Sequence, residues 1–410
     1  MPKSPAHPNP PKAPQAQTIF GVQKPIFWLG IVSFLTDVSS EMIFSILSVF
    51  LTVVLGASTV ILGIMEGLAD FAASSLDFIS GYLSDKTGKR KIFALFGYGF
   101  STLAKCLLVV VSNVAGVFSF RVIERLGKSI RGAPRDALIS SLSEKSKLGF
   151  SFGFHKMLDK TGAVLGPFIA YFLLSAFGQN PQTFQLLFIV AVIPALLSVL
   201  ILGIFVKDKP APSRTRQNIF TLYKESTPAF KKYLKVAGFF SIAYFSFAFL
   251  MLKAYQVGFE IKDIVLLYAL FNIAFTIISI PVGKIGDKIG RHKIILAEFI
   301  IYALMCLGFI FATTKLTVGL LFLVYGIFYA IDEGQTKAFI SDISSEETRA
   351  SSIGLYNFIT GMIYLPASLI AGFLWSQYGS AATFIFAGAI ALISAVAFKF
   401  SAYHEASSHR

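Results

Sequence analysis

The chain is a series of long apolar segments separated by short polar ones, and this pattern extends from residue 25 to residue 403. A run of about 20 apolar residues is long enough to cross the hydrocarbon core of a bilayer as an α-helix. Twelve such segments occur, in two groups of six. They cover residues 25–54, 58–83, 92–112, 115–139, 149–176, 183–206, 236–257, 263–282, 294–313, 317–341, 351–375 and 382–403. The pattern predicts an all-α integral membrane protein with 12 transmembrane helices.

The grouping predicts five regions along the chain. Residues 1–24 contain six of the 16 prolines and no apolar core, which is typical of a disordered tail rather than a signal peptide. A basic stretch separates the two groups of segments and predicts a linker. The expected regions are the tail 1–24, an N-terminal six-helix bundle 25–206, the linker 207–235, a C-terminal six-helix bundle 236–403 and a second tail 404–410.

Composition and charge support this architecture. Only 14% of the residues are charged, whereas a soluble protein has roughly 25%. The net charge of +14 would suggest nucleic-acid binding in a soluble protein. Here, 24 Lys and Arg residues lie in the tails and in alternate connections, against Lys262 and Lys315 in the opposite ones. This bias predicts cytoplasmic termini and a cytoplasmic linker, and it argues against nucleic acid as a partner.

Several kinds of chemistry lack their motifs. Cys106 and Cys306 lie in apolar segments and form no CxxC pair, so neither a disulfide nor a thiolate metal site is expected. Three of the five histidines lie in the predicted tails. The GKS at residues 127–129 lacks the upstream glycine of a phosphate-binding loop, and no HExxH or GxSxG occurs. We therefore expect no enzyme activity, metal or cofactor.

The stretch RVIERLGKSIRGAPRD, residues 121–136, carries seven charges inside the fourth apolar segment. At 100° per residue, all seven lie on one helix face about 140° wide. An unpaired charge at the bilayer centre costs about 2.5–3.5 kcal/mol on insertion scales, so this face is expected to point into the protein. The charged residues are Arg121, Glu124, Arg125, Lys128, Arg131, Arg135 and Asp136.

Other charges are expected at the same depth. Asp37 and Glu41 lie one turn apart in the first segment, and two neighbouring carboxylates in a low-dielectric site are candidates for proton coupling. The alternative is that they are permanent salt-bridge partners of Arg125 and Lys128. These two basic residues are in turn candidates to hold an anionic substrate group, unless Glu124 and the first segment neutralise them.

Further candidates lie in both halves. For proton coupling they are Glu66, His155, Asp159, Asp332 and Glu333, although a lone histidine in a helix is more often structural. For substrate contact they are Arg121, Lys253, Tyr244, Tyr356 and Asn357, although aromatic residues in membrane helices are more often packing residues. The sequence thus predicts a charged N-terminal half facing an aromatic C-terminal half.

The two halves also repeat. GYLSDKTGKRK at residues 81–91 recurs as GKIGDKIGRHK at residues 283–293, an offset of 202. A second match joins ALISSLSEKSKLGFSFG at 137–153 to AFISDISSEETRASSIG at 338–354. Duplicated bundles joined by a linker are typical of transporters that bind solute between two pseudosymmetric halves.

At these residues the chain resembles the major facilitator superfamily, whose loop between helices 2 and 3 reads G-x-L-x-D-R-x-G-R-[RK]-[RK]. Here Lys86 and Lys89 replace arginine, and His292 departs from the pattern in the second copy. The resemblance implies a gate on the cytoplasmic side, with topology anchoring as the alternative for the basic residues. The gating candidates are Gly81, Asp85, Gly88, Arg90, Arg135, Asp136, Gly283, Asp287, Gly290 and Arg291.

The resemblance also implies a function. We expect a monomeric secondary transporter in a bacterial inner membrane that moves a small organic anion by alternating access, coupled to protons. The helix-5 pattern of exporters is half present, since Gly162, Gly166 and Pro167 match while Ala170 and Tyr171 do not. An exporter of amphipathic or cationic compounds therefore stays open, as does a carrier of siderophores or other metal chelates. A non-transporting membrane sensor is the alternative from a different class.

Overall fold

The computed structural model describes residues 18–143, 147–206, 208, 219–345 and 349–401. Almost all of them are helical. The elements are β1 Thr18–Ile19, β2 Val22–Gln23, α1 Lys24–Val49, the π-helical turn η1 Phe50–Val54, α2 Thr59–Thr87, α3 Arg90–Val110, α4 Val114–Leu142, α5 Leu148–Phe177, α6 Pro181–Phe205, α7 Ile219–Glu225, α8 Pro228–Ser241, α9 Ala248–Gln256, α10 Ile261–Ile289, α11 Arg291–Phe311, α12 Lys315–Ile343, α13 Arg349–Tyr378 and α14 Ser380–Phe400.

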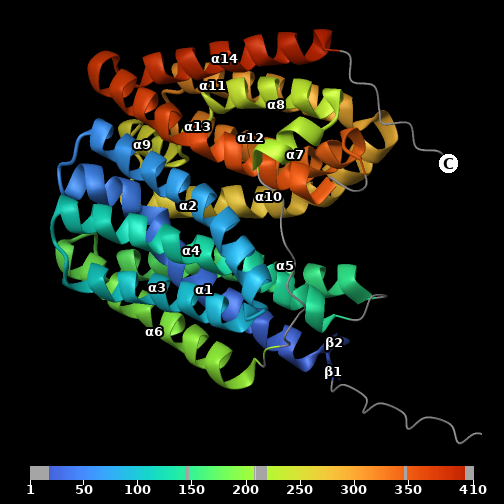
Figure 1. Ribbon diagram of the computed structural model, residues 1–410. Coiled ribbons are helices and arrows are strands. Elements are labelled where there is room, and N and C mark those ends of the chain that lie inside the picture. Colours follow the sequence, from blue (N-terminus) through green and yellow to red (C-terminus); the bar gives the residue numbers. More distant parts are fainter. Residues whose placement is uncertain (1–17, 144–146, 207, 209–218, 346–348, 402–410) are drawn as a thin grey trace, which may run out of the picture.

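The helices form two bundles. Figure 1 shows α1–α6 in blue to green below and α8–α14 in yellow to red above, with α7 between them. Large apolar side chains such as Phe96, Phe172 and Phe311 lie exposed on the outside, whereas charged side chains of α4 lie inside. This distribution suits lipid surroundings, since a membrane places its apolar surface outward and its ionisable groups toward the interior.

Local signals in the sequence set several helix starts. The side chains of Ser58, Asn113, Asn180 and Thr314 each accept a hydrogen bond from the backbone N–H three residues further on. Such caps satisfy N–H groups that have no partner within the helix. All four caps lie in short loops on the same side of the molecule, which we call the short-loop side.

The helices match the predicted segments closely except in the seventh. The prediction of one continuous helix over 236–257 is wrong, because α8 ends at Ser241 and α9 begins only at Ala248. The intervening segment 242–247 is non-helical although it contains neither Gly nor Pro. Three side-chain hydrogen bonds hold it: the Tyr302 hydroxyl donates to the Ala243 carbonyl at 2.7 Å, the Ser246 hydroxyl donates to Glu66 at 3.1 Å, and the Tyr244 hydroxyl donates to Asp332 at 3.0 Å.

Two predicted boundaries also differ from the structure. Residues 18–23 form a small antiparallel hairpin instead of continuing a disordered tail, while residues 1–17 lie outside the described part of the chain. The region predicted as linker contains α7 and the first two turns of α8, which begins at Pro228. Residues 402–410, and with them the second predicted tail, are also outside the described part.

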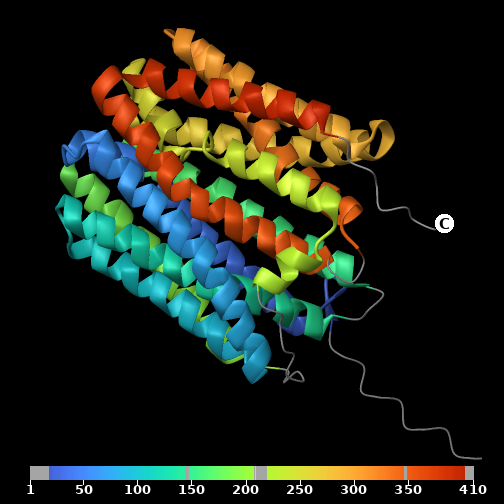
Figure 2. The ribbon, with the colours of Figure 1, turned by 45° about the horizontal axis from the view of Figure 1, so that its top comes forward.

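Among the described residues, ten helices are long and apolar enough to span a membrane. The charged stripe of α4 makes that helix less apolar, and the break leaves α8 and α9 short, which explains their absence from the ten. In Figure 2, α2 and α13 run side by side along the junction of the two bundles. Together with the contacts between α5 and α10, this packing joins the halves around a central cavity.

Candidate functional site

A cavity of about 560 Å³ lies between the two bundles. From the N-terminal bundle it is lined by Asp37, Glu41, Phe44, Leu47, Ser48, Glu66, Asp70, Arg121, Arg125, Lys128, Arg131, Gly132, Arg135, Lys156, Asp159, Lys160 and Ala163. From the C-terminal bundle it is lined by Tyr244, Phe245, Ser246, Phe247, Ala248, Met251, Tyr268, Phe271, Asn272, Tyr325, Tyr329, Asp332, Glu333 and Tyr364. The expected contrast between a charged half and an aromatic half is confirmed.

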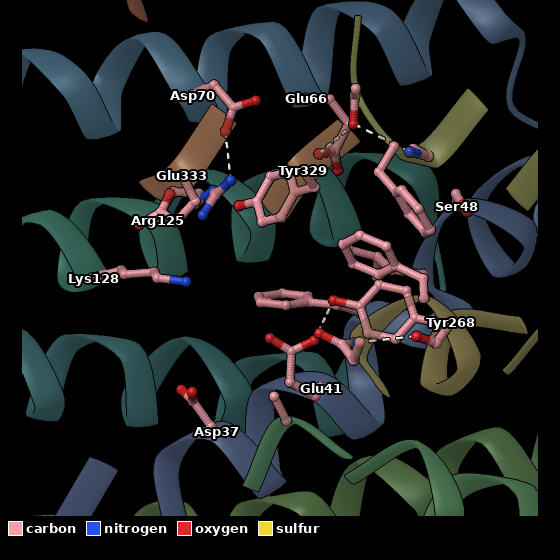
Figure 3. Close-up of a pocket in the computed structure, with 18 of the residues that line it drawn as sticks. Asp37, Glu41, Ser48, Glu66, Asp70, Arg125, Lys128, Tyr268, Tyr329 and Glu333 are labelled. Atoms are coloured by element: carbon pink, nitrogen blue, oxygen red, sulfur yellow. Dashed lines mark hydrogen bonds and ion pairs between the residues drawn. The ribbon is translucent and has the colours of Figure 1, made fainter. Parts of the chain in front are cut away.

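The charged face of α4 points inward, as its spacing predicts. Arg121 and Glu124 are 7% and 0% exposed. Arg121 donates from Nε and Nη2 to the two carboxylate oxygens of Glu66 on α2, at 2.8 and 2.7 Å. One turn further on, Arg125 Nη2 donates to Asp70, also on α2, at 2.5 Å (Figure 3). The principal partners of both arginines therefore lie on α2.

Lys128 differs from these two arginines. It is exposed toward the cavity, and Figure 3 shows its side chain extending into the open space. It interacts electrostatically with Asp37, but within the described residues it forms no hydrogen bond and no ion pair closer than 4 Å. Lys128 is thus a lining cation that is available to a solute.

The two acids of α1 both line the cavity. Glu41 accepts a short hydrogen bond from the hydroxyl of Tyr268 on α10, so this contact joins the two halves (Figure 3). Asp37 interacts electrostatically with Asp159, Glu41 and Lys128. In the part of the chain that the structure describes, neither acid forms an ion pair with Arg125 or Lys128. The alternative of permanent salt bridges to α4 therefore does not describe this conformation.

Helix α5 adds charges toward the side opposite the short-loop side, which we call the long-loop side. Asp159 accepts a hydrogen bond from Ser33 at 2.7 Å and lies 3.4 Å from the Lys156 ammonium. His155 is 3% exposed and is not part of the lining. Arg135 lines the cavity and pairs with its neighbour Asp136 at 3.0 Å, while Asp136 itself lies outside the lining.

The C-terminal bundle places two acids of α12 at the cavity. Asp332 accepts a hydrogen bond from the Tyr244 hydroxyl at 3.0 Å, and Tyr244 belongs to the non-helical segment between α8 and α9. Glu333 pairs with Lys337 one turn away at 2.8 Å. Asp332 therefore has a hydroxyl partner, whereas Glu333 has a cation.

Three predicted contacts lie elsewhere. Tyr356 stacks on Tyr233 with ring centroids 6.0 Å apart, Asn357 is exposed and Lys253 is half-buried, and none of the three lines the cavity. On a helix of uncertain rotation, their sequence position could not distinguish the cavity face from its neighbours. Substrate contact by these three residues therefore remains a prediction, and none of them lies in the lining of this cavity.

The aromatic wall contains tyrosines that sequence reasoning missed. Tyr325 and Tyr329 lie one turn apart on α12, directly before Asp332 and Glu333, and Tyr268 precedes Asn272 by one turn on α10. Polar residues repeated at helical spacing in an apolar helix mark an inward face. This spacing could have identified Tyr268, Tyr325 and Tyr329 as lining residues, whereas no such pattern marks Tyr364 on α13.

The repeated loops occupy equivalent positions in the two halves. Gly88 and Gly290 end α2 and α10 with positive φ of 68° and 93°, which glycine adopts without strain. Arg90 donates to the Ala137 carbonyl at 3.1 Å. Arg291 bridges Asp287 and Asp342 at 3.0 and 2.5 Å. The side chain of Asp85 is outside the described part of the structure.

Comparison with known proteins identifies the family to which this chain belongs. The model of the Major Facilitator Superfamily matches residues 29–331 and 236–409. The chain belongs to the major facilitator superfamily (MFS). An uncharacterized MFS-type transporter of Methanocaldococcus jannaschii is 38% identical over 381 residues, 91% of this chain and 94% of the relative. The multidrug resistance protein MdtG of Enterobacter lignolyticus is 25% identical over 278 residues, 62% of each chain.

Solved structures of MFS proteins share the fold. A mutant of the nucleoside transporter NupG superposes with a TM-score of 0.79 at 14% identity, covering 92% of this chain and 100% of that one. A mutant of the peptide transporter POT gives a TM-score of 0.78 at 12% identity, covering 93% of this chain and 95% of that one. Members of this family are transporters rather than enzymes. The chain is therefore a multi-pass membrane transporter with the MFS fold.

This MFS transporter has its halves in contact on the short-loop side. A Cβ added to Gly63 of α2 would lie 2.3 Å from the Ser368 carbonyl oxygen of α13, so the two backbones meet there directly. At the same side, Gln179 donates to Glu260 at 3.0 Å across the junction. Hydrogen bonds from Lys262 and Gln179 hold the pKa of Glu260, which lies in a loop, below its usual value.

No metal site is evident in the ranges that the structure describes, since they contain no group of three or more His, Cys, Asp and Glu residues placed to hold an ion. The chemistry of the cavity lining is that of hydrogen bonding, ion pairing and aromatic contact.

Proposed function

We propose that this MFS transporter moves a small organic solute with an anionic group across a bacterial inner membrane by alternating access, coupled to protons. The observation that carries the proposal is Lys128, a cation exposed in a cavity enclosed between two bundles, without an ion-pair partner among the described residues. A carboxylate or phosphate of a solute would satisfy this charge. The cavity volume of about 560 Å³ lies within the range typical of small-molecule sites.

Alternating access is supported by the contacts between the halves. The bundles meet on the short-loop side through α2 with α13 and through Gln179 with Glu260. The charge bias predicts that this side is extracytoplasmic, so the conformation would face the cytoplasm. Rocking of one bundle against the other would exchange the side on which the cavity opens.

Proton coupling is supported by the acids of α1. Asp37 interacts with the carboxylates of Glu41 and Asp159, so three like charges lie close together beside Lys128 and Lys156. A proton held by one of the acids would relieve this repulsion, and its release would change the charge that a solute meets. We propose Asp37 and Glu41 as the proton-binding pair.

The test is a stability screen followed by transport in proteoliposomes. Organic acids, phosphate esters, siderophores and lipophilic cations would be compared at pH 5.5 and 7.5. A ligand at 100 times its Kd adds about 2.7 kcal/mol of stability, which is a readable shift in melting temperature. Stabilisation by anions that is lost in Lys128→Gln but kept in Lys399→Gln, an exposed lysine of α14, would support the proposal.

Proton movement would be followed with a pH-sensitive dye inside the vesicles. Solute addition is expected to change the internal pH with the wild-type protein, and Glu41→Gln is expected to exchange solute without moving protons. Glu225→Gln, on the exposed face of α7, serves as the matched control. Solute uptake with no pH change in the wild-type protein would refute coupling to protons.

A second candidate, export of cationic or amphipathic compounds, is favoured by a separate observation. Glu41 and Asp332 have tyrosine hydroxyls as partners and lie beside the aromatic wall, which is where an organic cation would bind. Stabilisation by lipophilic cations alone, lost in Glu41→Gln, would decide for this candidate and against an anionic solute.

A further inference from the structure

The charges that line the cavity balance. Seven carboxylates and seven cations face it, so its formal charge is zero. The carboxylates are Asp37, Glu41, Glu66, Asp70, Asp159, Asp332 and Glu333, and the cations are Arg121, Arg125, Lys128, Arg131, Arg135, Lys156 and Lys160. A solute with a net charge would disturb this balance, whereas a solute that carries both signs would preserve it.

An exposed positive charge available to a solute lies on α4, whereas Lys160 of α5, which also lines the cavity, is placed 4.3 Å over the Phe275 ring. Arg121 is occupied by Glu66 through two hydrogen bonds, and Arg125 uses one nitrogen for Asp70. Lys128, one turn from Arg125 toward the long-loop side, has three N–H donors and no hydrogen-bond partner within the described chain. An anionic group would bind at Lys128 with Arg125 beside it.

The negative charge available to a solute lies on α1 and is completed by the other half. The Tyr268 hydroxyl donates to Glu41, which forms no ion pair closer than 4 Å among the described residues. Two further rings surround this tyrosine, because the Phe247 centroid lies 5.3 Å and the Phe271 centroid 6.0 Å from that of Tyr268. A carboxylate beside aromatic faces is suited to an ammonium group.

The two charges face the same space. Figure 3 shows Lys128 extending from α4 and Glu41 extending from α1 into one opening, with Tyr268 on its far side. From this arrangement we infer that the solute is zwitterionic, with its anionic group at Lys128 and its ammonium group at Glu41. The inference rests on the proposed function and narrows its substrate class.

An ammonium group at Glu41 would also act on the contact between the halves. It would compete with the Tyr268 hydroxyl for the carboxylate, and this hydrogen bond joins α1 to α10. A solute that carries only the anionic group would leave the bond in place. The zwitterion would therefore favour the conformations in which α1 and α10 separate, while a simple anion would not.

The experiment compares solutes that differ only in charge. Three sets are used, built on phenylalanine, leucine and glycylphenylalanine, each as the zwitterion, the N-acetylated anion and the C-terminal amide cation. Binding to the purified full-length protein is measured at pH 7 by thermal stabilisation and by calorimetry. In at least one set, the zwitterion is expected to bind tenfold or more tightly than both of its partners.

Variants assign the two charges. Glu41→Gln is expected to reduce zwitterion affinity to that of the N-acetylated anion, and Lys128→Gln to that of the amide, while Glu225→Gln and Lys399→Gln change neither. Tyr268→Phe keeps the ring and frees the Glu41 carboxylate, so it should tighten the zwitterion and leave the N-acetylated anion unchanged. This last variant retains the test should Glu41→Gln fail to fold.

Each other outcome overturns the inference in a distinguishable way. If the N-acetylated anions bind as tightly as the zwitterions, or if no set binds while other organic anions do, the zwitterion is wrong and the anion transporter stands. If only the amides bind, both are wrong and the cation exporter replaces them. If no solute of any charge stabilises the folded protein, the proposed function itself fails.

Discussion

The direct backbone contact at Gly63 predicts that a single methyl group will change the balance between the conformations. A Cβ at Gly63 would lie 2.3 Å from the Ser368 oxygen, and side-chain carbons almost never approach closer than 3.0 Å. Helices α2 and α13 would therefore have to separate by about 0.7 Å in Gly63→Ala. Overpacking of this kind costs about 1–3 kcal/mol, and the cost falls on the conformation in which the two helices touch.

This free-energy cost changes the relative populations of the two conformations. A difference of 1–3 kcal/mol multiplies the ratio of short-loop-open to short-loop-closed molecules by about 5–150. Spin labels at Ser112→Cys and Tyr378→Cys, both exposed on the short-loop side, would report the separation of the halves there. With Cys106 and Cys306 replaced, Gly63→Ala is expected to enlarge the long-distance population in a double electron–electron resonance measurement.

The matched control is Gly99→Ala on α3. No atom lies within 4 Å of a Cβ added at this position, so the substitution adds a methyl group and helix propensity without a clash. Its distance distribution should equal that of the parent protein. If folded Gly63→Ala shows the parent distribution as well, the contact of α2 with α13 does not determine closure of the short-loop side.

Three further predictions follow from other contacts. Arg121→Gln is expected to lower the free energy of unfolding in detergent by about 3–5 kcal/mol, because it leaves the buried Glu66 carboxylate without its cation. The double variant with Glu66→Gln should recover most of this loss, and no recovery would contradict the pairing. Asp342→Asn should cost no more than about 1 kcal/mol in the same assay, because its ion pair with Arg291 is partly exposed and screened; a larger loss would mean that the pair supports the fold. The depressed pKa of Glu260 means that its contribution to closure is present at neutral pH and is lost as pH falls through the depressed pKa. Spin-label distances in the wild-type protein should therefore lengthen only below the usual glutamate pKa, and a Glu260→Gln variant with the same pH profile would exclude this residue.

The sequence determined most of the helices because apolar length and local caps act within each segment. It did not reveal the break at 242–247, where the residues IAYFSF carry no helix-breaking signal. Ala243 and Ser246 make contacts with α11 and α2 there, and these partners are more than 50 residues away along the chain. A helix break that is stabilised by tertiary contacts cannot be predicted from the local helix propensity of the residues.

The candidate site could also be predicted only in part, because the sequence indicates which residues share a helix face but not which residues they pair with. Spacing placed Arg121, Arg125 and Lys128 on one inward face, because helical periodicity fixes which residues share a side. Spacing could not show that Glu66 and Asp70 would pair with the two arginines and that Lys128 would have no ion pair among the described residues, because the register between α2 and α4 depends on packing. For the same reason Tyr268 was missed and Tyr356 was expected in the wall.

The seventh helix is also the place where the two repeats stop being interchangeable. With the offset of 202, Glu41 of α1 corresponds to Ala243 and Phe44 to Ser246, inside the non-helical segment. A hypothetical protein assembled from two N-terminal bundles would set two arginine-rich α4 faces against one cavity and would lack the hydroxyl that meets Glu41. The twofold repeat is therefore retained in the arrangement of the helices of this transporter. The side chains at the cavity are not repeated, because one half supplies most of the charges and the other supplies the aromatic rings, so the site needs both halves.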